Sequence, residues 1–288
     1  MKAKLLATLI VSSALLSACT TTTGSNADAT KALTNKEKAV AVLNSIESGN
    51  PQAISYINST NYTQHNLAVG DGLAGFGEVL QALPKGSAKV HVVRAFEDGN
   101  YVFTQTDYNF FGPKVGFDVF RFDKGQIVEH WDNLIAKADK PNPSGHTQLD
   151  GSLAVTDLDK TAANKALVSD FVNTVLVKGE YQKMSQFFDG DNYIQHNPAI
   201  GDGLSGLGKA IDEMAKHSIQ MTFSKVHKVL GEGNFVLTIS EGKFAGKATS
   251  YYDLFRVENG KIAEHWDVME TILPKSKWKN TNGKFGHL

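Results

Sequence analysis

The sequence has little of what marks several common classes of protein. It holds a single cysteine among 288 residues, so no disulfide can form within the chain. Its formal net charge is −1, so the clustered basic surface that binds nucleic acid is not expected. The composition, 41% hydrophobic and 20% charged, is that of a globular chain long enough for two domains of ordinary size.

Several catalytic signatures are missing as well. The two glycine-rich stretches lack the Gly-Lys-Ser/Thr ending of a phosphate-binding loop and no strand is expected before them. The chain has no Gly-x-Ser-x-Gly turn and no His-Glu-x-x-His or His-x-His pair. These absences argue against nucleotide binding, serine-hydrolase chemistry and a zinc-hydrolase site.

The N-terminus carries the most specific local signal. A short positive segment is followed by an apolar run from Leu5 to Leu16, which is too short to span a membrane and has the layout of a secretory signal. The ending Leu16-Ser-Ala-Cys19 resembles a bacterial lipobox, so we expect residues 1–19 to be a lipoprotein signal with lipidation at Cys19. The alternative is an ordinary signal peptide with a coincidental cysteine. Thr20 after the cysteine implies an outer-membrane lipoprotein that faces the periplasm, with the lipid as the only membrane contact.

The rest of the chain is a duplication. After a polar tether (20–33), the sequence predicts a first repeat (34–137), a linker (138–163), a second repeat (164–274) and a basic tail (275–288). Four spaced lysines in the tail are typical of a solvated end. The block that begins at Tyr62 recurs at Tyr193, and Asp118-Val-Phe-Arg recurs as Asp253-Leu-Phe-Arg.

Each repeat reads as helices followed by strands. Thr34-Asn-Lys-Glu37 predicts a capping box that opens a helix, and Asn164–Val177 is the same helix again. The expected strands of the first repeat are Val90–Phe96, Tyr101–Tyr108, Lys114–Phe122 and Gln126–Asp132. This order indicates an α+β fold made of two tandem cones, each a curved antiparallel sheet wrapped by helices.

The stretch Glu-His-Trp-Asp occurs once in each repeat, as Glu129–Asp132 and Glu264–Asp267. Because alternate residues of a strand share a face, His265 and Asp267 should point to one side and Trp266 to the other. His130 and Asp132 should be paired likewise. We expect both tryptophans to pack into the helices or into the contact between repeats.

Taken together, these motifs resemble the SnoaL-like branch of the nuclear-transport-factor-two-like superfamily. The resemblance rests on Tyr-x-Gln-His-Asn-Pro (Tyr193–Pro198), the Gly-Asp-Gly behind it, Asp-x-Phe-Arg and Gly-Lys-Ile-x-Glu-His-Trp-Asp. It implies a cone with an apolar pocket and an internal pseudo-dimer of the two repeats. It also implies aldol-type acid/base chemistry on a small hydrophobic or carbonyl-containing molecule, with neither metal nor organic cofactor.

The resemblance gives candidate roles to particular residues. Asp267 and Asp132 match the acid/base position, His265 and His130 would be donors or partners of the aspartates, and Asp253 and Asp118 would orient the imidazoles. The expected substrate-binding residues at the pocket mouth are His196, Asn197, Tyr193, His65, Asn66 and Tyr62. A His/Asp pair at a strand end is also common as a purely structural hydrogen bond, and the Gln-His-Asn turn can serve the backbone of the Gly-Asp-Gly loop.

Two further alternatives stay open. Convergence of His65, His130, Asp118 and Asp132 would make a metal site, although no metal-binding spacing supports it. A non-catalytic envelope lipoprotein would use the same cones to hold a hydrophobic molecule or a protein partner. The repeats also differ, with Leu67 against Pro198 and Phe110-Phe111 against Gly242-Lys243, which makes the second repeat the better match to the family.

Overall fold

The computed structural model describes residues 32–288. The expected signal peptide, Cys19 and nearly all of the tether lie outside the described residues. Within residues 32–288, no helix is both long and apolar enough to cross a membrane.

The first repeat begins with the expected capping box. The Thr34 hydroxyl accepts from the Glu37 backbone N–H at 3.2 Å, and the Glu37 carboxylate accepts from the Thr34 N–H at 2.7 Å. These bonds satisfy two otherwise unpaired donors at the helix start. The elements of this repeat are α1 (Asn35–Ser48), α2 (Pro51–Ile54), β1 (Thr63–Gln64), α3 (Gly72–Ala82), β2 (Lys89–Asp98), β3 (Tyr101–Asn109), β4 (Pro113–Asp123) and β5 (Gln126–Ala136).

The second repeat follows the same order. Its first helix starts at Thr161, three residues before the expected start, and its last turn widens into a π-helical stretch (Val172–Val177). The elements are α4 (Thr161–Phe171), β6 (Ile194–Gln195), α5 (Gly203–Lys216), β7 (Met221–Glu232), β8 (Phe235–Phe244), β9 (Lys247–Glu258) and β10 (Lys261–Thr271). Short 3-10 turns cover Leu158–Lys160, Tyr181–Gln186 and Lys275–Lys277.

The glycine-rich blocks build helices rather than open loops. Asp71 and Asp202 precede α3 and α5, and Gly72 and Gly203 adopt positive φ angles of 68° and 76° where the helices start. A Cβ on Gly75 would collide with the backbone of Gly70, so the helix lies directly against the turn before it. These helices were not predicted.

Each sheet has five strands, in the order β1-β5-β4-β3-β2 and β6-β10-β9-β8-β7. The long strands are antiparallel, while the two-residue strands β1 and β6 pair parallel with β5 and β10. The parallel pairing sets Gln64 beside His130 and Gln195 beside His265. The expected α+β class is confirmed.

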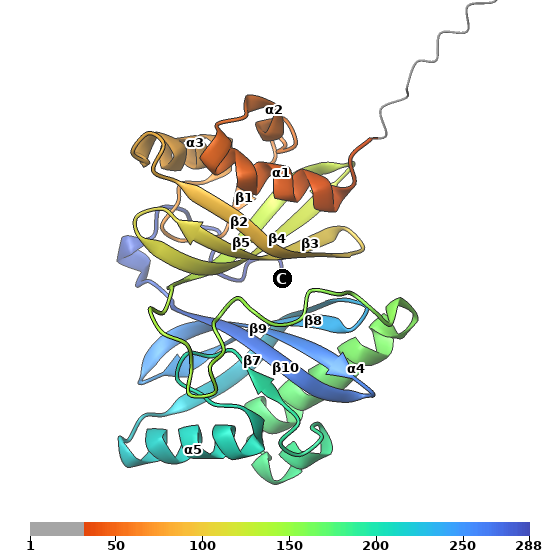
Figure 1. Cartoon of the computed structure of the whole chain (residues 1–288). Coiled ribbons are helices and arrows are strands. Elements are labelled where there is room, and N and C mark those ends of the chain that lie inside the picture. Colours follow the sequence, from red (N-terminus) through yellow and green to blue (C-terminus); the bar gives the residue numbers. More distant parts are fainter. Residues whose placement is uncertain (1–31) are drawn as a thin grey trace, which may run out of the picture. The chain divides into compact units, whose positions relative to one another are not determined.

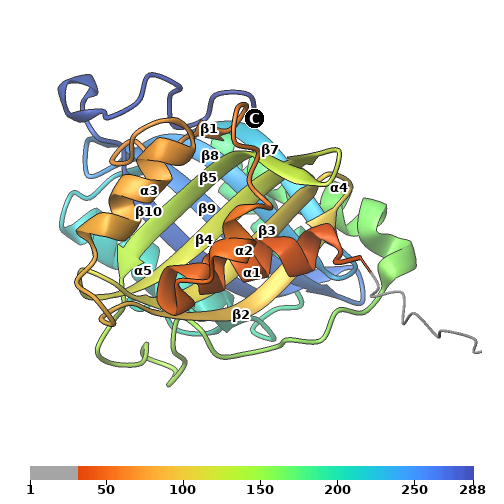
Figure 2. The ribbon, with the colours of Figure 1, turned by 90° about the horizontal axis from the view of Figure 1, so that it is seen from above.

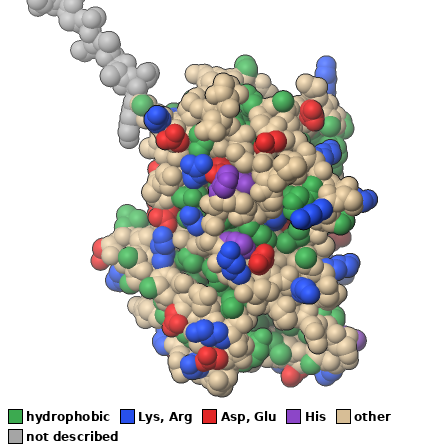
Figure 3. Space-filling model, turned by 180° about the vertical axis from the view of Figure 1, so that it is seen from behind, with side chains coloured by type: hydrophobic (Ala, Val, Ile, Leu, Met, Phe, Trp, Pro, Cys, Tyr) green, Lys and Arg blue, Asp and Glu red, His purple; other side chains and the backbone are tan. Residues whose placement is uncertain are grey.

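The two sheets face one another, and the helices lie on their outer faces (Figures 1 and 2). A single apolar cluster fills the layer between the sheets and includes Trp131 and Trp266, both fully buried. It also holds Phe103, Phe117, Phe235 and Leu254. On the surface seen in Figure 3, Lys and Arg side chains alternate with Asp and Glu side chains.

Two segments reach from one repeat to the other. Residues 138–152, here the first arm, dock on the second repeat, where Asn142 Nδ2 donates to the carbonyl oxygens of Gln195 (2.6 Å) and Ile200 (2.9 Å). Residues 278–288, the second arm, dock on the first repeat, where Asn280 Nδ2 donates to the carbonyls of Asn66 and Val69. The expectation of a solvated basic end is wrong for these residues: Lys284 is 4% exposed and donates to the backbone carbonyl of Asp132.

Candidate active site

The second repeat gathers a polar network on the face of its sheet that carries the helices. His265 Nε2 lies 3.2 Å from Asp253 Oδ1, and its Nδ1 lies 3.1 Å from Gln195 Oε1. The ring also stacks on Phe255, which packs against the helix residue Phe171. Trp266 points into the layer between the sheets, so the alternation expected from the sequence is what the structure shows.

The two ring nitrogens of His265 contact different partners, Asp253 and Gln195. Gln195 Oε1 accepts from the backbone N–H groups of His196 and Asn197, both at 2.9 Å, which identifies it as the oxygen of the amide. His265 Nδ1 must therefore be the donor to Gln195. The second ring nitrogen, Nε2, is hydrogen-bonded to the Asp253 carboxyl group.

Asp267 is held by one amide. Asn197 Nδ2 donates to both of its carboxylate oxygens, at 3.0 and 2.8 Å, and Asn197 Oδ1 accepts from the Ala199 N–H, which fixes the amide orientation. Burial raises the pKa of Asp267, and the neighbouring Asp253 raises it further, while His265 and Asn197 oppose the shift. A carboxylate with a raised pKa is a stronger base than aspartate in water.

The first repeat repeats this network with different surroundings. His130 lies 3.2 Å from Asp118 Oδ1 and 3.1 Å from Gln64 Oε1, and Asn66 Nδ2 donates to Asp132 Oδ2 at 2.8 Å. Here burial, with the nearby Asp132, raises the pKa of Asp118, against the hydrogen bonds from His130 and Tyr108. Asp132 is only 5% exposed, whereas Asp267 is partly open to solvent.

His65 and His196 are not at a pocket mouth, contrary to expectation. Their side chains lie on the opposite face of the sheets, because each follows a short parallel strand and turns into the layer between the repeats. His196 stacks on Trp266, with ring centroids 4.6 Å apart and an interplanar angle of 6°. Its Nε2 lies 2.9 Å from Glu264 Oε1. His65 stacks on Trp131 in the same manner.

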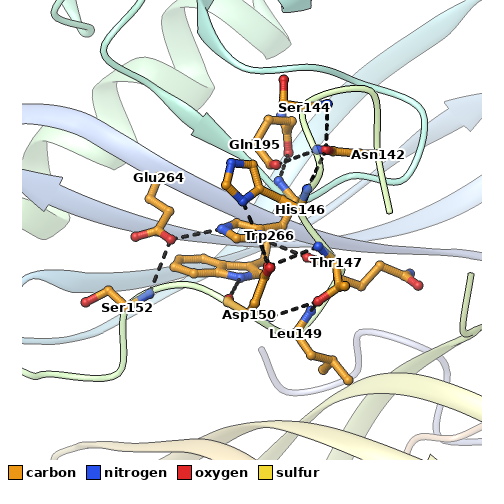
Figure 4. A network of polar contacts seen from close by, with 12 residues as sticks. Asn142, Ser144, His146, Thr147, Leu149, Asp150, Ser152, Gln195, Glu264 and Trp266 are labelled. Atoms are coloured by element: carbon orange, nitrogen blue, oxygen red, sulfur yellow. Dashed lines mark hydrogen bonds and ion pairs between the residues drawn. The ribbon is translucent and has the colours of Figure 1, made fainter. Parts of the chain in front are cut away.

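The arms complete these histidine clusters. His196 Nδ1 lies 2.8 Å from the carbonyl oxygen of Thr147, and Trp266 Nε1 donates to the carbonyl oxygen of Asp150, both in the first arm (Figure 4). In the first repeat, His65 Nδ1 and Trp131 Nε1 bond the carbonyl oxygens of Gly283 and Gly286.

The glutamates beneath these histidines are held as anions. Burial raises the pKa of Glu264, but hydrogen bonds from His196 and Arg256 outweigh it and leave the pKa below its ordinary value. Glu129 is held low in the same way by His65, Arg121 and His287. We therefore infer that these histidines and glutamates, on the face between the sheets, stabilise the fold and do not bind the substrate.

Tyr62 and Tyr193 lie behind the network. Each hydroxyl accepts from a glutamine amide, Gln64 Nε2 at 3.2 Å and Gln195 Nε2 at 3.0 Å. Both tyrosines are buried, and that burial raises the pKa of each phenol. Their role is to orient the two glutamines that position His130 and His265.

The residues missed by sequence reasoning are those two glutamines and the two arms. Gln64 and Gln195 stand inside the recurring Tyr-x-Gln-His-Asn motif, which was the available signal. The arms gave a weaker signal, an asparagine followed by a Gly-His pair: Asn142 with Gly145-His146, and Asn280 with Gly286-His287.

Three clusters among the described residues have the donor atoms for a metal ion. They are His65 with Glu129 and His287, His146 with Asp150 and His196, and Asp118 with His130 and Asp132. The alternative in which His65 converges with the last of these does not occur, because His65 lies on the other face of the sheet. Two clefts, of about 430 and 220 Å³, lie elsewhere, one between α1 and β2 beside Glu47 and Lys89 and one at the first arm beside Pro198.

The chain is thus an α+β protein in which each sheet carries a cluster of His, Asp and Asn side chains on its helix-facing side. Residues 168–265 of the second repeat match the family model of the SnoaL-like domain. No curated protein matches the sequence.

Three solved structures each match between 35% and 40% of this chain. An NTF2-like protein of unknown function from Cytophaga hutchinsonii is 16% identical, with 37% of this chain and 94% of that chain covered and a TM-score of 0.32. A candidate ketosteroid isomerase from Kribbella flavida is 11% identical (40% and 83% covered, TM-score 0.34). IdmH of Streptomyces antibioticus, a candidate polyketide cyclase, is 15% identical (35% and 92% covered, TM-score 0.32).

Proposed function

We propose that the second repeat performs cofactor-independent acid/base chemistry on a small carbonyl compound, with Asp267 as the base. The observation that carries this proposal is the Asp267 carboxylate, which has a raised pKa, is held by Asn197 and lies beside the hydrogen-bonded pair His265 and Asp253. The SnoaL-like match falls on the same repeat.

The step uses only groups of this chain. The Asp267 carboxylate takes a proton from the carbon next to the substrate carbonyl, and the C–H electron pair moves to form an enolate. The enolate oxygen is stabilised by hydrogen-bond donors of the site. The proton then returns to a different carbon in an isomerisation. In an aldol closure, the enolate carbon attacks a second carbonyl, whose oxygen takes the proton from Asp267.

We assign the first repeat a supporting part. Its Asp132 is buried, and the second arm covers that repeat with Lys284 Nζ 4.0 Å from Asp132 Oδ1. In the second repeat Asp267 keeps partial access to solvent, whereas the side chains of His130 and His265 are equally exposed, at 11% and 12%. The two repeats together would then work as a pseudo-dimer with one reactive site.

The test is an exchange assay in D₂O with a panel of small ketones. Proton NMR measures how fast the protons next to each ketone carbonyl are replaced by deuterium. We expect exchange by the full-length chain in detergent and its loss in Asp267→Asn. If ketones bind equally to both proteins and neither exchanges their protons, the chain is a binder without this chemistry. That result would replace the enzyme proposal with the rival role of holding a ligand.

We also propose that the chain is held at the outer membrane by a lipid on Cys19. The support is the sequence of the apolar run and Leu16-Ser-Ala-Cys19. Cys19→Ser should abolish incorporation of labelled palmitate and release the protein from the membrane fraction. Continued labelling of Cys19→Ser would refute the anchor.

A further inference from the structure

The two repeats place a buried tyrosine differently on the helix-facing side of their sheets. In the first repeat, Tyr108 of β3 lies beside Gly116 of β4, and a Cβ on Gly116 would lie 3.1 Å from the tyrosine ring. The strand register makes Gly242 and Tyr251 the corresponding residues of the second repeat, since Thr104 faces Asp118 and Thr238 faces Asp253. Tyrosine and glycine have therefore exchanged strands.

The exchange cannot be reversed in the second repeat. A Cβ on Gly242 would collide with the backbone carbonyl of Thr222, because a bulge brings β7 close to this point. Tyr251 instead lies on Phe223, with ring centroids 4.3 Å apart. Both repeats therefore place a tyrosine ring in this region, but the hydroxyl of Tyr251 lies at a different position from that of Tyr108.

The consequence falls on the aspartate that pairs with the histidine. In the first repeat, the Tyr108 hydroxyl donates to Asp118 Oδ2 at 2.6 Å, so that oxygen has a hydrogen-bond partner. In the second repeat, Asp253 Oδ2 has no hydrogen-bond partner within residues 32–288, and Asp253 is 4% exposed. The Tyr251 hydroxyl has none either; the nearby Thr249 hydroxyl donates to the Lys247 carbonyl oxygen.

Two more hydroxyls extend this set. Thr238 and Ser240 are fully buried, and neither hydroxyl has a partner. Thr238 faces Asp253 and Ser240 faces Tyr251 across β8 and β9, so all four side chains point to the same side of the sheet as His265. In the first repeat, the matching Thr104 and Thr106 bond each other at 3.3 Å.

Native proteins leave few buried polar atoms unpaired, so four such atoms on one side of the sheet, next to His265, call for a further polar partner. We propose that Thr238, Ser240, Tyr251 and Asp253 bind the oxygen atoms of the substrate, which is an oxygen-rich carbonyl compound bearing hydroxyl groups. This inference rests on the proposed function for its reaction, while its ligand class stands on the four atoms themselves.

The experiment uses acetone, hydroxyacetone and dihydroxyacetone, which share a carbon skeleton and carry none, one and two hydroxyls. Proton exchange by the full-length chain is divided by the rate that acetate gives with the same ketone, which removes differences in intrinsic acidity. Binding of each ketone is followed in parallel by saturation-transfer NMR. We expect a normalised preference for dihydroxyacetone over acetone of about tenfold or more, the effect of about one hydrogen bond.

The variants Thr238→Val, Ser240→Ala and Tyr251→Phe should each reduce that preference, with Tyr108→Phe as the matched control that leaves it intact. Equal normalised rates and equal binding for the three ketones, or a preference unchanged in all three variants, would overturn the inference. Hydroxyl-dependent binding without exchange would uphold the ligand class and reject the reaction, so the two proposals fail separately.

Discussion

The two repeats agree on one face of their sheets and differ on the other. Between the sheets, each has a histidine stacked on a tryptophan and bound to a buried glutamate, with an arm of the chain closing the cluster. On the helix-facing side, the same His, Asp and Asn residues recur. Asp118 accepts a hydrogen bond from Tyr108, whereas Asp253 Oδ2 has no partner among the described residues. The comparison teaches that the shared face maintains the assembly, whereas the divergent face is free to specialise.

The largest expected effect separates the two networks. Asp267→Asn should lower ketone proton exchange by about two to four orders of magnitude, the usual contribution of a positioned proton-transfer group. Asp132→Asn tests the other repeat in the same assay, and we expect a change of less than about twofold. A large loss in Asp132→Asn would mean that both repeats react.

On the shared face, the repeats should respond alike. His196→Leu and His65→Leu each remove one hydrogen bond from a buried glutamate. Glu264 then keeps Arg256, and Glu129 keeps Arg121 and His287. We expect each variant to lose about 2–3 kcal/mol of unfolding free energy by urea titration. The exposed His217 serves as control, because His217→Ala should change stability by less than about 0.5 kcal/mol. Unequal losses at 65 and 196 would break the symmetry claimed for this face.

A smaller contrast concerns the exchanged tyrosines. Tyr108→Phe removes a 2.6 Å hydrogen bond to a buried carboxylate and should destabilise the fold by about 1–3 kcal/mol. Tyr251→Phe removes a hydroxyl that bonds nothing and should leave the unfolding free energy unchanged within about 0.5 kcal/mol. Thermal and urea unfolding of the two variants measure the difference. Equal destabilisation would show that Tyr251 is bonded within the fold.

The smallest expected effect is a shift in the midpoint of the pH–rate profile for proton exchange. The pKa of Asp267 is raised by burial, and a base must be deprotonated to accept a proton. The exchange rate should therefore fall as the pH is lowered through a midpoint above about 4, the ordinary value for aspartate. A pH–rate profile at constant ionic strength gives the midpoint. The profile of Asp267→Asn should lack this step, and a midpoint at or below 4 would contradict the raised pKa.

What the sequence predicted was local or periodic. The capping box at Thr34 and Glu37 needs only neighbouring residues, and the opposite facing of His265 and Trp266 follows from strand alternation. The expected strands of the first repeat match β2 to β5 with small extensions at their ends. The SnoaL-like resemblance of the second repeat agrees with the match of residues 168–265 to the SnoaL-like family model.

What the sequence did not predict depends on pairing across long distances. The side of the sheet on which His196 lies is decided by the parallel pairing of β6 with β10, about 70 residues further on. Asn280 meets Asn66 across 214 positions. The strand exchange of Tyr108 and Gly116 with Gly242 and Tyr251 becomes visible only once the register is known.

The crossing arms have a consequence for the order of folding. The segment that finishes the first repeat, residues 278–288, stands behind the whole second repeat in the chain, so His65 and Trp131 receive their final partners only after every other element has been made. During synthesis, the first repeat therefore lacks these partners until residues 278–288 have been made. A fusion to residue 288 or a cut before residue 278 should therefore destabilise the first repeat before the second.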